Sequence, residues 1–120
     1  MCGIAGYFNP DQNYAENPKQ NFHTLSRMIN TMNHRGPDTY GHTIINSCCL
    51  AHTRLSIIDL ENGRQPMSYT KDGNTYYIVY NGEIYNYKAL TAELTALGHC
   101  FATRTDTEVL LHGWEQWGRE

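Results

Sequence analysis

The spacing of hydrophobic residues divides the chain into segments with the period of strands and segments with the period of helices. A Gly-flanked apolar run over residues 4–8 predicts a buried first strand. Apolar residues then recur at three- and four-residue steps from Phe22 to Met32, which predicts an amphipathic helix of about three turns that ends near Gly36-Pro37. The polar, turn-rich residues 9–21 between them are expected to form a surface loop.

The middle of the chain predicts strands that are joined by tight turns. Residues 40–45 and 48–53 are expected to pair as a hairpin around Asn46-Ser47. The sequence Lys71-Asp72-Gly73-Asn74 is a strong hairpin-turn signal, and a strand is expected to follow it over residues 75–80.

The last third of the chain predicts two helices. Asn86 is a suitable N-cap for a helix that is closed by Gly98, and residues 99–103 are expected to form a short strand. Residues 105–108 have the capping-box pattern and open a second helix. Because several strands pair as hairpins, the sequence predicts an α+β fold with a mainly antiparallel sheet. The apolar side of the second helix is expected to carry Val109, Leu110, Leu111, Trp114 and Trp117.

Composition narrows the class of protein. A chain of 120 residues is one domain at most, and its net charge of −3 gives no reason to expect a nucleic acid as partner. The longest apolar runs are too short to span a bilayer, and the N-terminus lacks the basic region of a signal peptide. No membrane association is therefore expected, and the cytoplasm is the expected location.

The four cysteines and six histidines do not have the spacing of a metal site or of a disulfide framework. We interpret Cys48, Cys49 and Cys100 as small apolar residues that are buried or half-buried. His34 and His52 are interpreted as structural residues that form hydrogen bonds.

Cys2 differs from the other cysteines because it directly follows the start methionine. Removal of Met1 would leave a thiol and a free α-amine on one residue. The reference pKa is about 7.7–8.0 for the α-amine and about 8.5 for the thiol, so both groups can change protonation near neutral pH. Because a nearby amine helps to form the reactive thiolate, Cys2 is a candidate nucleophile. The alternative is an inert cysteine that stands at position two by chance.

Three further places carry candidate chemistry, and each has a simpler explanation. Arg54 begins an apolar stretch, where it could lean its aliphatic stem on the surface of a sheet. Asn81-Gly82 follows a predicted strand and could form a type I′ turn, and Glu83 beside it could be a solvated charge. Asp106 stands in the first turn of a predicted helix, where the helix dipole favours an acidic residue.

Longer motifs surround these candidates and follow one another along nearly the whole chain. They resemble the N-terminal glutaminase domain of glutamine-hydrolysing asparagine synthetases, which are class II glutamine amidotransferases of the Ntn-hydrolase type. Aminosugar synthases and phosphoribosyl amidotransferases share the N-terminal cysteine but lack the long Asn-Gly-Glu-Ile-Tyr-Asn segment. The motifs are Met1-Cys2-Gly3-Ile4-Ala5-Gly6, His34-Arg35-Gly36-Pro37-Asp38, Ala51-His52-Thr53-Arg54-Leu55-Ser56-Ile57-Ile58-Asp59, Gln65-Pro66-Met67, Asn81-Gly82-Glu83-Ile84-Tyr85-Asn86 and Thr105-Asp106-Thr107-Glu108-Val109.

The resemblance implies an Ntn-hydrolase-type αββα sandwich of mainly antiparallel sheets, with the C-terminal part of the domain missing. Residues 2–120 would be the N-terminal portion of a glutamine amidotransferase type 2 domain after removal of Met1. The implied reaction is hydrolysis of glutamine to glutamate and ammonia. Cys2 would be the nucleophile and its α-amine the general base. The Asn81 side chain and the Gly82 N–H would be catalytic as donors to the oxyanion, each worth roughly 3–4 kcal/mol of barrier.

The resemblance also implies how the glutamine substrate is bound. Arg54 would take the α-carboxylate, a role that suits a planar guanidinium. Asp106 and the Glu83 region would take the α-ammonium group. Asn81 and Gly82 would also contact the substrate. The pocket would be lined, partly through backbone groups, by Leu55, Ser56, Ile57 and Ile58.

The implied partner is a C-terminal synthetase domain of the same protein, which is absent from this chain. That domain would use ATP and magnesium to make asparagine from aspartate and the ammonia. In the present segment no cofactor or metal is expected, because the sequence lacks a Gly-rich phosphate loop. A homodimer is one possible assembly. The alternative function is that of a non-catalytic fragment or remnant of such a domain, acting in glutamine binding or in association.

Overall fold

The structure of the protein is a computed structural model that describes residues 2–35, 39–54 and 63–119. Helices and antiparallel strands occur together, which confirms the predicted α+β class. The elements are β1 (Gly3–Phe8), the 3₁₀ turn η1 (Tyr14–Glu16), α1 (Pro18–Thr31), β2 (Thr39–Ile45), β3 (Cys48–Arg54), β4 (Met67–Lys71), β5 (Asn74–Ile78), α2 (Tyr87–Ala96) and α3 (Asp106–Trp117).

The first half of the chain forms a three-stranded antiparallel sheet in the order β1-β3-β2. The predicted hairpin of β2 and β3 is confirmed, with Ile45 paired to Cys48 across the turn. Each of these strands is one residue longer than predicted, since Thr39 pairs with Arg54 at the far end of the hairpin. Arg54 is thus the last residue of β3. The apolar stretch that follows it lies outside the described residues.

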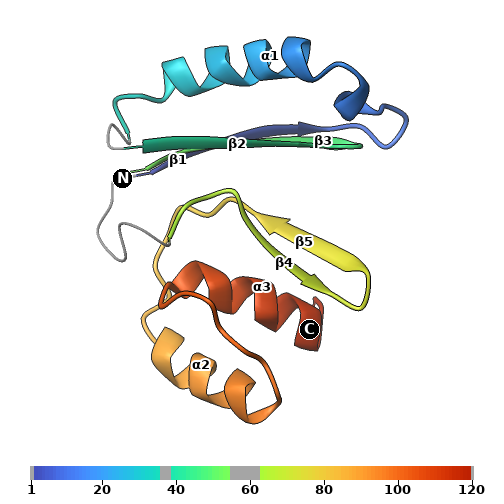
Figure 1. The fold of residues 1–120 in the computed structure, drawn as a ribbon. Coiled ribbons are helices and arrows are strands. Elements are labelled where there is room, and N and C mark those ends of the chain that lie inside the picture. The colour runs from blue at the N-terminus through green and yellow to red at the C-terminus, as the bar shows by residue number, and fades with distance from the viewer. Residues whose placement is uncertain (1, 36–38, 55–62, 120) are drawn as a thin grey trace.

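Helix α1 covers one face of this sheet (Figure 1). The buried core between helix and sheet consists of Leu25, Ile29, Cys49 and Ala51.

The first strand is only partly buried, which corrects the prediction of a buried strand. Ala5 and Tyr7 pack against the core under α1. The alternate residues Ile4 and Phe8 are 49% and 67% exposed. Successive side chains of a strand point to opposite faces, and in the described residues α1 covers only one of them.

Helix α1 begins four residues earlier than the hydrophobic period predicts. Pro18 occupies the first turn, where a missing N–H costs little. Asn21 is buried, and its amide donates to the carbonyls of Tyr14 (2.8 Å) and Asn17 (3.0 Å) and accepts from the Tyr7 hydroxyl (2.8 Å). Because a polar residue fills this buried position, the apolar spacing misses the first helical turn.

The hairpin of β4 and β5 confirms the predicted turn. Asp72 and Gly73 have φ angles of 52° and 80°, the positive values that a type I′ turn requires. The second strand ends at Ile78, two residues before the predicted end. Val79 and Tyr80 therefore leave the sheet and lead into Asn81-Gly82.

The two C-terminal helices agree with the sequence pattern in part. The predicted start at Asn86 and closure at Gly98 are confirmed for α2, although the Asn86 side chain makes no capping hydrogen bond. Thr105 caps α3 by accepting a hydrogen bond from the Glu108 N–H. Trp114 and Trp117 are 50% and 40% exposed, so the predicted apolar side of α3 is only partly buried.

Residues 99–103 do not form the predicted strand. The N–H groups of Ala102 and Thr103 donate to the Glu108 carboxylate at 2.8 and 2.7 Å. A carboxylate thus takes the donors that a strand would give to its neighbour. The Glu108 side chain accepts these hydrogen bonds instead of accepting one from the N–H of the N-cap residue Thr105, as a complete capping box would require.

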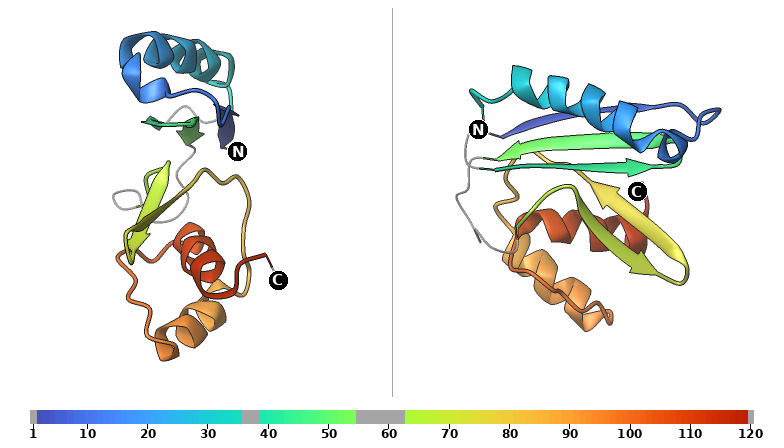
Figure 2. Two further views of the ribbon diagram at one scale, coloured as in Figure 1. Left: turned by 90° about the vertical axis from the view of Figure 1, so that its right-hand side faces the viewer. Right: turned by 45° about the horizontal axis from the view of Figure 1, so that its top comes forward.

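The elements are arranged in layers. Figure 1 shows α1 over the three-stranded sheet, the β4–β5 hairpin on the other side of that sheet, then α3 and finally α2. The views in Figure 2 keep this order. The start of α3 and the segment after β5 consequently lie on the side of the sheet opposite α1.

The three cysteines other than Cys2 have different environments. Cys49 is fully buried in the core and Cys48 is half-buried, as predicted. Cys100 is exposed, which corrects the prediction that it is at least half-buried. None of the helices in the described part of the chain combines the length and the hydropathy needed to cross a membrane.

Candidate functional site

Cys2 lies at one end of the three-stranded sheet, directly before β1, and is half-buried. The strand is held there by a hydrogen bond of 3.1 Å from the Gly3 N–H to the Thr53 hydroxyl. Gly3 pairs with Thr53 at the end of the antiparallel register, and Cys2 and Arg54 each lie one residue beyond this pair. The predicted nucleophile and the predicted carboxylate-binding residue thus lie at the same end of the three-stranded sheet.

Two observations describe the surroundings of this pair. Arg54 is only 6% exposed, which excludes the simpler explanation of a stem lying on the sheet surface. The Arg35 Nε donates a hydrogen bond of 3.2 Å to the Cys2 carbonyl, so a residue of the His34-to-Asp38 motif anchors the N-terminus.

The Asn81-Gly82 segment is not a type I′ turn. Both residues are described and exposed, and neither has the positive φ that such a turn requires. A Cβ atom at position 82 would lie 2.6 Å from the hydroxyl oxygen of Tyr80 and 2.8 Å from its ring carbon Cζ. A side chain at position 82 would therefore displace the hydroxyl end of the Tyr80 ring, which lies close to the Gly82 backbone.

The backbone of Tyr80 is held by two side chains rather than by a strand. Its N–H donates to the Gln65 Oε1, and its carbonyl is 3.3 Å from the His52 Nε2. His52 is buried on β3, two residues before Arg54. The interpretation of His52 as a structural hydrogen-bonding residue is confirmed, whereas His34 is exposed.

Asp106 contacts the same segment from the start of α3, and Glu83 belongs to that segment. The Ile84 N–H donates to the Asp106 Oδ2 at 3.0 Å, so Asp106 does more than stabilise the helix dipole. Burial raises the pKa of the Tyr80 phenol, and the negative charges of Asp106 and Glu83 raise it further. The two predicted ammonium-binding carboxylates therefore share one neighbourhood around Tyr80.

The structure brings the predicted residues together in two groups. The first group is Cys2 and Arg54, at one end of the sheet. The second group is residues 81–83 with Asp106. A hydrogen bond from His52, on the same strand as Arg54, to the carbonyl of Tyr80, directly before Asn81, connects the two groups. The predicted pocket residues Leu55, Ser56, Ile57 and Ile58 lie outside the described residues.

A cavity of about 610 Å³ opens beside these groups. Among the described residues its lining includes none of the predicted site residues, but it includes His52 and Gln65, the two residues that hold Tyr80. Gln65 is a residue to which sequence reasoning gave no role, although the Gln65-Pro66-Met67 motif was visible. The cavity is lined by Thr39, Tyr40, Gly41, His42, His52, Arg64, Gln65 and Pro66.

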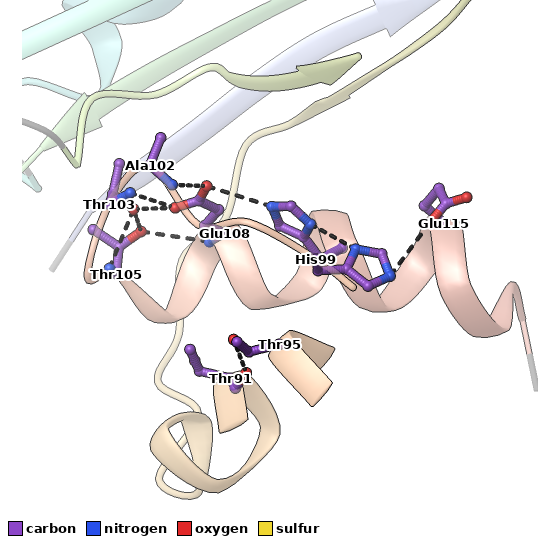
Figure 3. A network of polar contacts seen from close by, with 9 residues as sticks. Thr91, Thr95, His99, Ala102, Thr103, Thr105, Glu108 and Glu115 are labelled. Atoms are coloured by element: carbon purple, nitrogen blue, oxygen red, sulfur yellow. Dashed lines mark hydrogen bonds and ion pairs between the residues drawn. The ribbon is translucent and has the colours of Figure 1, made fainter. Parts of the chain in front are cut away.

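A separate polar network connects α3 to the segment before it (Figure 3). The Glu108 carboxylate accepts from Ala102 and Thr103 and lies 3.4 Å from the His112 Nε2. The Nδ1 atoms of His112 and His99 are 2.8 Å apart, so one of them must donate a proton to the other. Both rings are buried, and we assign this network to the packing of the helix. In the described part of the chain, no group of three His, Cys, Asp or Glu residues could hold a metal ion.

Stability is expected to fall as the pH is lowered from about 7.5 to about 5.5. Burial lowers the pKa of His52, with a smaller contribution from Arg54, and burial also lowers the pKa of His112 beside His99. The unfolded chain, with a histidine pKa of about 6.5, therefore binds more protons than the folded chain in this range.

Urea unfolding at the two pH values measures this effect. A His52→Gln variant keeps an N–H donor for the Tyr80 carbonyl but cannot titrate, so its free energy of unfolding should depend less steeply on pH. Equal pH dependence in the variant and the parent protein would contradict the assignment to His52.

Comparisons with known proteins agree with these motifs. The family model described as "Glutamine amidotransferase domain" matches residues 1–120. Asparagine synthetase [glutamine-hydrolyzing] 3 of Bacillus subtilis is 43% identical over 117 residues, which cover 98% of this chain and 18% of the relative. Asparagine synthetase [glutamine-hydrolyzing] of Zea mays is 45% identical over 120 residues, which cover 100% of this chain and 19% of the relative.

A third relative has similar coverage. Asparagine synthetase [glutamine-hydrolyzing] 3 of Arabidopsis thaliana is 40% identical over 120 residues. The match covers all of this chain and 19% of that protein. The chain therefore spans about one fifth of the length of these curated relatives.

Proposed function

Because the chain belongs to the glutamine amidotransferase domain family, we propose that it contributes to the hydrolysis of glutamine to glutamate and ammonia, with Cys2 as the nucleophile. The observation that carries this proposal is the antiparallel pairing of Gly3 with Thr53, which brings Cys2 and Arg54, the residues next to this pair, to the same end of the sheet. A nucleophile and a buried cation at one end of a sheet suit an amide substrate that carries a carboxylate.

In the proposed reaction, Met1 is first removed so that Cys2 has a free α-amine. That amine takes the thiol proton, and the thiolate attacks the side-chain amide carbon of glutamine. The tetrahedral intermediate collapses to a thioester as ammonia leaves with a proton from the amine. Water then attacks the thioester, which releases glutamate and restores the thiol.

The Asn81 amide and the Gly82 N–H are proposed as donors to the oxyanion of the tetrahedral intermediate. The close packing of the Tyr80 ring on Gly82 supports this role, since it holds the backbone in one conformation. A donor that is fixed before the reaction costs no reorganisation when the negative charge develops.

The two charged groups of the substrate backbone have proposed partners at the end of β3 and at the start of α3. Arg54 binds the α-carboxylate, and Asp106 with Glu83 binds the α-ammonium group. One oxygen of Asp106 already accepts from Ile84, so the second oxygen is the one assigned to the ammonium. Leu55 to Ile58 remain assigned to the lining of the pocket.

The finer fold and the wider reaction belong to the same proposal. The order of the layers supports an Ntn-hydrolase-type αββα sandwich, of which residues 2–120 would form the N-terminal portion. We further propose that the ammonia is used for asparagine synthesis by a synthetase domain outside this segment. ATP and magnesium are assigned to that domain as part of the same proposal.

The experiment that tests this function is the intact mass of the purified protein before and after exposure to an electrophilic glutamine analogue. The expected result is loss of Met1 and a single adduct on Cys2 that excess glutamine prevents. Retention of Met1, or labelling spread over Cys48, Cys49 and Cys100, would overturn the catalytic proposal. It would favour the alternative of a non-catalytic glutamine-binding or associating segment.

An Arg54→Ala variant is expected to raise the KM for glutamine by about 100-fold, because the substrate carboxylate loses its charged partner. Arg54→Lys keeps the charge but loses the bidentate geometry, and a rise of about tenfold is expected. Since Arg54 is buried, each variant needs a thermal unfolding measurement beside its kinetics. An unchanged KM in a folded Arg54→Ala protein would remove Arg54 from the substrate site.

A further inference from the structure

We infer that Gln65 is a positioning residue that sets the location of the Asn81-Gly82 oxyanion donors through Tyr80. The inference rests on the proposed function of those donors and adds a residue that acts on them indirectly. The argument starts from the two ends of the Gln65 side-chain amide.

The Gln65 amide connects the segment after β5 to the start of α3. Its Oε1 accepts from the Tyr80 N–H, and its Nε2 donates to the Thr107 hydroxyl at 3.2 Å. Tyr80 directly precedes Asn81, and Thr107 directly follows Asp106. One side chain therefore sets the spacing between the proposed oxyanion donors and a proposed ligand of the substrate ammonium.

Gln65 is itself held against the sheet. A Cβ atom at position 41 would lie 2.2 Å from the Gln65 carbonyl oxygen, so the strand β2 and the Gln65 backbone are in direct contact at a glycine. This contact leaves no room for a side chain at position 41. The backbone that carries the Gln65 side chain is therefore packed against strand β2. A positioning group should be attached to a strand or helix in this way.

The effect of Gln65 reaches Gly82 through a short chain of contacts. Tyr80 lies beyond the last residue of β5, so strand pairing does not fix its backbone. Its N–H and its carbonyl therefore each need another hydrogen-bond partner. Gln65 takes the N–H and His52 the carbonyl. The hydroxyl end of the Tyr80 ring then lies against Gly82, where a Cβ atom would lie 2.6 Å from the Tyr80 hydroxyl oxygen. Loss of the Gln65 bond should let Tyr80, and with it Gly82, shift.

The test replaces Gln65 by methionine, which has a similar length but neither accepts nor donates in this way. Gln20→Met is the matched control, since Gln20 is exposed on α1. Backbone hydrogen exchange of residues 79–84 is expected to quicken about tenfold or more in Gln65→Met and to stay unchanged in the control. The kcat for glutamine is expected to fall about 10- to 100-fold, with KM within about twofold.

A double-mutant cycle separates positioning from general destabilisation. In an Asn81→Ala background, Gln65→Met is expected to lower kcat by a smaller factor than in the parent protein, because one of the two donors that it positions is already gone. Gln65→Glu keeps an acceptor for the Tyr80 N–H and is expected to retain most of the kcat. The inference would be overturned if the losses in kcat of Gln65→Met and Asn81→Ala were fully additive in the double variant. It would also be overturned if Gln65→Glu lost as much kcat as Gln65→Met.

The remaining outcomes are also decisive. Unchanged hydrogen exchange in Gln65→Met overturns the inference whether or not glutamine is hydrolysed. An inactive parent protein with an unlabelled Cys2 overturns the proposed function, while the exchange measurement still decides whether Gln65 holds the segment. If Gln65→Met does not fold, Thr107→Val removes only the acceptor of the Gln65 Nε2. An unchanged exchange rate in that variant contradicts the inference.

Discussion

Replacing Cys2 by alanine is expected to lower the kcat for glutamine hydrolysis by about 10⁴-fold or more, because the thioester cannot form without the nucleophile. The expected loss is the largest of any substitution considered for this protein. Glutamate release at saturating glutamine measures it. The oxyanion donors and the substrate-binding charges remain in the variant, so glutamine binding should be retained.

Cys100→Ala is the matched control for this substitution. Cys100 is exposed and lies in the segment between α2 and α3. Both helices lie beyond the β4–β5 hairpin, away from the three-stranded sheet (Figure 1). Its replacement is expected to leave kcat within about twofold, since surface substitutions away from special features have small effects. A Cys2→Ala protein that keeps more than a tenth of the parent kcat would show that another group is the nucleophile.

Replacing Asn81 by alanine is expected to lower kcat by about 10²- to 10³-fold, while KM changes by less than about threefold. The side-chain amide is assigned to the oxyanion, which exists only after the thiolate has attacked. An interaction made only in the transition state appears in kcat and not in the binding of the ground state. Asn81 is exposed and is not in a type I′ turn, so its loss should not disturb the fold.

Steady-state kinetics of Asn81→Ala and of Asn30→Ala check this prediction. Asn30 is an exposed residue of α1, and its replacement should leave both constants unchanged. Equal losses in glutamine affinity and in turnover for Asn81→Ala would assign the side chain to substrate binding instead. That result would leave the Gly82 N–H as the proposed donor to the oxyanion.

Local sequence was sufficient wherever the deciding interactions lie within a few residues. The Asp72-Gly73 turn follows from the need for positive φ angles, which these residue types adopt at low cost. The start of α3 at Thr105 follows from a hydroxyl that reaches the N–H three residues on. The pairing of β2 with β3 follows from two apolar runs around a short turn.

Local sequence failed where a distant side chain replaced a backbone partner. Residues 99–103 have the composition of a strand, but the Glu108 carboxylate takes the N–H groups of Ala102 and Thr103. The first turn of α1 was missed because Asn21 is buried by hydrogen bonds to Tyr7 and to the preceding carbonyls. Hydrophobic periodicity contains no information about such contacts.

The candidate site divides in the same way. The sequence by itself determined the family and the identity of the candidate residues, because the motifs around Cys2, Arg54 and Asn81 are contiguous stretches of chain. Only the tertiary structure decided how they are held. The pairing of Gly3 with Thr53 brings Cys2 and Arg54 to one end of the sheet, and Gln65 joins Tyr80 to Thr107 across a long separation in the chain. The close approach of the Tyr80 side chain to Gly82 is likewise a contact that no local pattern reveals.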